Sequence, residues 1–147
     1  MENKKDRIYT STVVIFWMTV VLFIMTILNI FVMDSIDLFN RYVFFSSAVA
    51  LSCSGIALIV LAFKARITRI SRAFFILTGA SAFGMVISSV LHNLIYALLT
   101  VLFGEGLWTS MGDEPVFFIL ATVICPLALL VGMTGGIVMI ARKKVLA

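Results

Sequence analysis

The feature that most constrains this chain is a set of long apolar runs without a single Asp, Glu, Lys or Arg. They cover residues 12–33, 43–63, 73–103 and 116–141. Each is at least as long as the roughly 20 residues that an α-helix needs to cross ~30 Å of hydrocarbon. Backbone groups find no water inside a bilayer, and the runs lack the alternation of barrel strands, so they must be helices. The sequence therefore predicts an all-α integral membrane protein, with residues 1–147 forming one antiparallel four-helix bundle.

Composition excludes a water-soluble protein. The chain is 63% hydrophobic and 12% charged, whereas soluble domains are roughly half apolar and about 25% charged. The net charge of +4 could suggest a nucleic-acid partner. However, the basic residues flank the apolar runs, as membrane-edge charges do. We therefore expect a lipid bilayer around the chain and no nucleic-acid partner.

Charge also predicts the orientation. The N-terminus, the 64–72 loop and the C-terminus hold all Lys and Arg residues except Arg41, which lies on the opposite side with most of the acidic residues. Short loops follow the positive-inside rule, so both termini should be cytoplasmic. The first run is too long for a signal peptide and no small-residue cleavage site follows it. With two cysteines and no targeting segment, we expect a prokaryotic cell membrane.

Small residues along the fourth run predict a helix-packing face. They recur in alternating steps of four and three, a 3.5-residue period typical of left-handed packing. These residues are Ala121, Cys125, Ala128, Gly132 and Gly135, and Gly136 completes a GxxxG pattern with Gly132. Packing within the chain is the preferred interpretation, and dimerisation through this face is the alternative. Pro126 should kink this helix, as a structural bend rather than a functional hinge.

The third run is too long for a simple span. A helix over residues 73–103 would measure ~46 Å and would need a tilt of about 50° to fit in the bilayer. We therefore expect residues 94–103 to project beyond the outer face or to bend over. Ala80 and Gly84 begin a ridge with four-residue steps, which favours a steeper crossing than in the other helices.

A few polar side chains in the runs form a candidate polar site. They are His92, Asn93, Ser88, Asn29 and Thr26. His92 is the only histidine, and an ionisable side chain within a membrane span suggests function. Its position near the outer interface favours a structural, hydrogen-bonded role instead. A metal site shared with the acidic loop residues Glu105, Asp113 and Glu114 is a weaker alternative.

The sequence contains no catalytic motif: HExxH, GxSxG, the P-loop and GxGxxG are all absent. We therefore predict no catalytic, cofactor or metal residues, no cofactor and no enzymatic activity. The leading hypothesis is a non-catalytic structural, assembly or regulatory component that contacts a membrane-protein partner or a second copy. The alternative is a small channel or transporter for a neutral or weakly polar solute, and an intramembrane enzyme ranks third.

Overall fold

The computed structural model describes residues 4–32, 38–104 and 115–142, and these ranges are helical apart from the turn at residues 65–68 and single residues at helix ends. The elements are α1 (Lys4–Val32), α2 (Leu38–Lys64), α3 (Arg69–Phe103), α5 (Pro115–Ile119), the π-helical turn η2 (Leu120–Ile124) and α6 (Cys125–Ala141). Together, α5, η2 and α6 form the fourth long segment. Four helical segments are long and apolar enough to cross a membrane. The prediction of an all-α chain with four such helices is confirmed.

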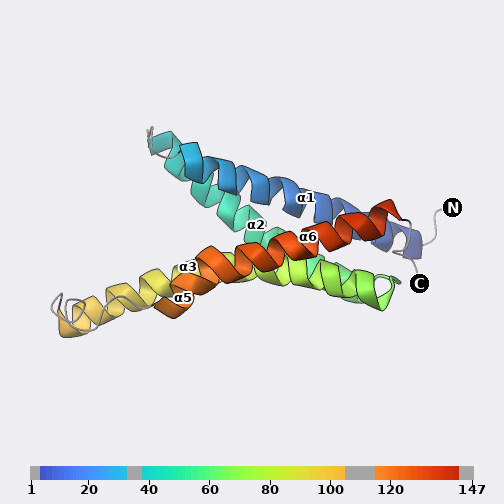
Figure 1. Ribbon diagram of the computed structural model, residues 1–147. Coiled ribbons are helices and arrows are strands. Elements are labelled where there is room, and N and C mark those ends of the chain that lie inside the picture. Colours follow the sequence, from blue (N-terminus) through green and yellow to red (C-terminus); the bar gives the residue numbers. More distant parts are fainter. Residues whose placement is uncertain (1–3, 33–37, 105–114, 143–147) are drawn as a thin grey trace.

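The helices form two antiparallel hairpins that diverge from each other (Figure 1). One hairpin is α1 with α2, and the other is α3 with the fourth segment. The start of α1, the turn between α2 and α3, and the end of α6 lie at one end of the molecule. At the other end the two hairpins are well separated, so the arrangement differs from a parallel-sided bundle.

Two glycines bring the backbones of α2 and α3 into contact where the helices cross. A Cβ atom on Gly55 would lie 2.6 Å from the carbonyl oxygen of Gly79, and one on Gly79 would lie 2.5 Å from the carbonyl oxygen of Gly55. The two backbones therefore touch at this point. Close approach of this kind is how small residues set steep crossings between membrane helices. Beyond the contact, α2 and α3 separate.

The turn between α2 and α3 is fixed by side chains. Thr68 caps α3 by accepting a hydrogen bond from the Ser71 N–H at 3.3 Å. The Arg72 guanidinium donates to the carbonyl oxygens of Ala62 and Ala65 at 3.2 and 3.4 Å. This places a positive charge at the C-terminus of α2, where the helix dipole favours it. We call the end of the molecule that holds this turn, the start of α1 and the end of α6 the closed end. Its turn is held by several hydrogen bonds.

The core joins the hairpins near this closed end. Phe16 of α1 is fully buried, and its ring centroid lies 5.1 Å from that of Phe75 in α3. A Cβ on Gly136 of α6 would lie 2.7 Å from the Phe16 ring, so the absence of a side chain there makes room for it. Phe16 therefore packs between both helices of the second hairpin.

The fourth segment is irregular before Pro126. The N–H of Cys125 bonds to the carbonyl of Leu120, five residues back, which defines the π-turn. Thr122, four residues before Pro126, donates its hydroxyl to the Phe118 carbonyl at 2.7 Å. The kink itself stays a prediction.

Candidate functional site

Hydroxyl groups line the contact between α1 and α2. Thr19 Oγ1 lies 3.1 Å from Ser54 Oγ, and Thr26 Oγ1 lies 3.4 Å from Ser47 Oγ. All four residues are buried. In membranes such contacts contribute only about 0.6 kcal/mol each on average, but they fix which helix faces meet. This seam holds the first hairpin together.

Small residues line the contact between α3 and the fourth segment. A Cβ on Gly132 would lie 2.6 Å from Thr78 Oγ1, and one on Gly84 would lie 3.1 Å from Cys125 Sγ. Ala121 is buried and Ala128 is half-buried, whereas Ala80 is exposed. The neighbouring Gly79 lies against Gly55 of α2.

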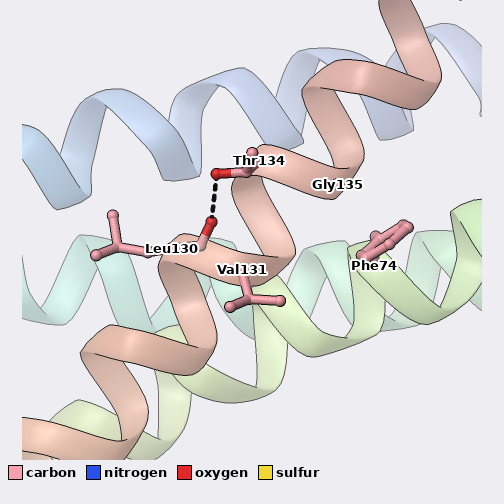
Figure 2. A pocket seen from close by; sticks show the side chains of 5 residues that line it. All are labelled: Phe74, Leu130, Val131, Thr134 and Gly135. Carbon is pink, nitrogen blue, oxygen red and sulfur yellow. Dashed lines mark hydrogen bonds between the residues drawn. The ribbon is translucent and has the colours of Figure 1, made fainter.

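Figure 2 shows the same interface around Gly135. The Phe74 ring of α3 points at Gly135, where a side chain would clash with it. Beside this contact is a shallow hollow of about 340 Å³, which Leu130, Val131 and Thr134 also line. The Thr134 hydroxyl donates to the Leu130 carbonyl at 2.8 Å. The glycines of the GxxxG segment thus face partners within this chain.

The residues of the candidate polar site are divided between the hairpins. Thr26 and Asn29 belong to the last turns of α1, and Ser88, His92 and Asn93 belong to the second half of α3. These parts of α1 and α3 lie on the diverging arms in Figure 1. The five residues therefore do not surround a common path.

Adjacent residues on α3 also face different neighbours. The His92 ring lies 5.6 Å from the Phe118 ring of α5, centroid to centroid, and its Nδ1 atom is shielded from solvent. Ser88, one turn earlier, is buried. Asn93 instead lines a hollow between α2 and α3 and donates to the Ser89 carbonyl at 2.7 Å. His92 therefore packs in the contact between α3 and α5, whereas Asn93 borders the hollow between α2 and α3.

Two larger apolar hollows lie on the described surface. The first, of about 570 Å³, lies between α1 and Ala50 of α2, with Trp17 in its lining. The second, of about 540 Å³, lies where α2 and α3 diverge. Its walls are Phe44, Phe45, Ala48 and Val49 from α2 and Val86, Ser89, Val90 and Asn93 from α3. His92 lines neither hollow.

Most polar side chains of the described spans are bonded to their own helix. Their hydroxyl or amide group donates to a carbonyl three or four residues back, at distances of 2.7 to 3.0 Å. These residues are Thr12, Thr19, Thr26, Asn29, Ser46, Ser47, Ser54, Thr78, Ser89, Asn93, Thr100, Thr122 and Thr134. Such bonds satisfy a polar group without requiring water or a ligand.

Sequence reasoning missed two contacts that organise the molecule: the Gly55–Gly79 crossing and the fit of Phe74 against Gly135. Glycines in apolar runs were the available signal, but the sequence does not say which glycines face each other. The carboxylates considered as metal ligands, Glu105, Asp113 and Glu114, lie outside the described residues. No family model, curated protein or solved structure matches this sequence. Function must therefore be argued from the residues themselves.

Proposed function

We propose that this chain is a multi-pass cell-membrane protein with a non-catalytic structural, assembly or regulatory role, exerted through contacts between helices. The observation that carries the proposal is the bonding of polar donors in the spans to their own backbone. A channel or an intramembrane enzyme needs polar groups that converge on a path or a reacting atom. Here the candidate polar residues lie on separate arms and are bonded or packed locally.

The orientation we propose has both termini in the cytoplasm. Arg7, residues 64–72 and Arg142 belong to segments that lie together at the closed end of the molecule. This grouping is what the positive-inside rule requires of a single membrane face. The diverging end would then face the opposite side.

The surface that we assign to a partner helix is the exposed face of α1. Val14, Trp17, Met18 and Val21 are about half exposed and share one helix face in the pattern i, i+3, i+4, i+7, which suits packing against another helix. The hollow beside Ala50 adjoins this face and leaves room for side chains of a neighbour. Trp17, 43% exposed, is of the residue type that most often dominates interface energies.

Site-specific photocrosslinking in native membranes tests this assignment. A photoreactive residue at Met18 should form an adduct with one defined membrane protein or with a second copy. The matched control is Leu127 of α6, which is also exposed and apolar but lies on the other hairpin. A chain that stays strictly monomeric after gentle solubilisation, with no adduct from Met18, would refute the proposal. Solute flux in liposomes that is lost on His92→Ala would support the transporter alternative instead.

A further inference from the structure

The two hairpins differ in the length of their charge-free apolar runs. These runs have 22 and 21 residues in the first hairpin and 31 and 26 in the second. At 1.5 Å per residue the lengths are ~33 and ~32 Å for the first pair and ~46 and ~39 Å for the second. In one bilayer of ~30 Å, a longer apolar helix is accommodated by a stronger tilt. Unequal tilt of the two hairpins is compatible with the wedge between them.

The wedge has the depth of one leaflet. It begins at the Gly55–Gly79 contact and widens along α2 towards Phe44. Those eleven residues of α2 measure ~17 Å along the helix, close to the ~15 Å of half the hydrocarbon layer. Measured from the crossing, the apolar walls are therefore about as long as one leaflet is thick.

The hollow in the wedge has the size of a ligand site. It measures about 540 Å³, which falls in the ~300–1,000 Å³ range of small-molecule sites. A hydrocarbon chain fits this space.

A polar group at the wide end of the wedge also suits a lipid. Asn93 stands on α3 at the interface end of the wedge and is exposed. One of its amide N–H groups donates to the Ser89 carbonyl, and a carboxamide carries two such groups. The ester carbonyls of a glycerolipid are acceptors located at the depth where the hydrocarbon ends. An apolar cleft beneath an amide donor is complementary to an acyl chain beneath its ester.

We propose that the wedge between α2 and α3 binds one glycerolipid from the leaflet at the diverging end of the molecule. Its acyl chain lies between Phe45, Val49 and Val90, and the Asn93 amide donates to its ester carbonyl. The site is on a different face from the α1 surface assigned to a partner, so either proposal can fail without the other.

The test uses the purified full-length chain in phosphatidylcholine vesicles. A trace of phosphatidylcholine carrying a diazirine on its acyl chain is photolysed, and the labelled peptides are mapped by mass spectrometry. Labels should concentrate on residues 44–49 and 86–93. Ala48→Trp fills the wedge and should abolish most of this labelling, whereas Ala97→Trp, the same change at an exposed position of α3, should leave it unchanged.

Asn93→Leu provides a second test that keeps the wedge open. Loss of one hydrogen bond, worth about 1 kcal/mol, should lower the affinity for the lipid about fivefold and reduce the labelling. Labelling spread evenly over all exposed apolar faces, or unchanged in both Ala48→Trp and Asn93→Leu, would overturn the proposal. Labelling of these residues that disappears only when a partner protein's helix is supplied would overturn it in favour of that helix.

Discussion

Replacing Gly79 with alanine should force α2 and α3 apart. The new Cβ would lie 2.5 Å from the Gly55 carbonyl oxygen, whereas ordinary van der Waals contact begins at 3.4 Å. The helices must therefore separate by about 0.9 Å at their crossing. Overpacking costs about 1–3 kcal/mol, and a backbone oxygen cannot rotate away as a side chain can. We expect a loss of about 2–3 kcal/mol in the free energy of unfolding.

The measurement is unfolding by sodium dodecyl sulfate in mixed micelles, followed by circular dichroism and tryptophan fluorescence. Gly84→Ala is the matched control because it makes the same change on the same helix. Its Cβ would meet only the Cys125 Sγ atom, at 3.1 Å, and that side chain can turn aside. We expect a change within about 0.5 kcal/mol. Equal stability of the Gly79→Ala and Gly84→Ala variants would refute the backbone contact at the crossing.

Three further predictions follow from other contacts. Thr19→Val keeps the shape of the side chain but removes the hydroxyl at the α1–α2 seam, so unfolding free energy should fall by about 0.6 kcal/mol in the same titration. His92→Ala should cost about 1 kcal/mol through the lost contact with Phe118, and His92→Phe should restore it; a His92→Phe variant as unstable as His92→Ala would argue against a packing role. Spin labels at Phe45 and Leu94 should approach each other in vesicles of longer-chain lipids, because a thicker bilayer lets the longer hairpin stand more upright. The distance is measured by pulsed electron paramagnetic resonance. A distance that does not depend on lipid length would contradict the tilt argument.

The four long helices were predictable because their physical cause is local. Crossing hydrocarbon requires an uninterrupted apolar run, and each run can be recognised without knowing what it packs against. The unusual length of α3 was visible for the same reason. The structure adds that the helix continues without a break from Arg69 to Phe103.

Pairing of helix faces was less accessible, because it depends on the register between segments far apart in the chain. The 3.5-residue period of the fourth run singled out Gly132 and Gly135, and both face α3 in the structure. On α3 itself, the four-residue steps from Ala80 lead to Gly84, which faces Cys125 of the fourth segment, whereas Gly79 beside Ala80 touches α2. A shift of one residue turns a helix by about 100°, which is enough to exchange a contact for an exposed position.

The candidate polar site shows the same limit. His92 and Asn93 are neighbours in sequence, yet one packs on Phe118 and the other borders the wedge beside α2. The depth of both residues in the membrane could be estimated by counting residues from the basic loop at 64–72. Direction around the helix axis could not, because it depends on which neighbours fill each side.

The position of Phe16 has a consequence for how the protein is made. The ring sits on α1, which is synthesised before α6, but its surroundings include Gly136, close to the end of α6. Until α6 has been inserted, one side of the phenyl ring lacks the helix that it packs against. Chains that insert α6 in the wrong direction would leave this large side chain partly uncovered. Burial of a residue on α1 thus depends on the correct insertion of a helix made much later.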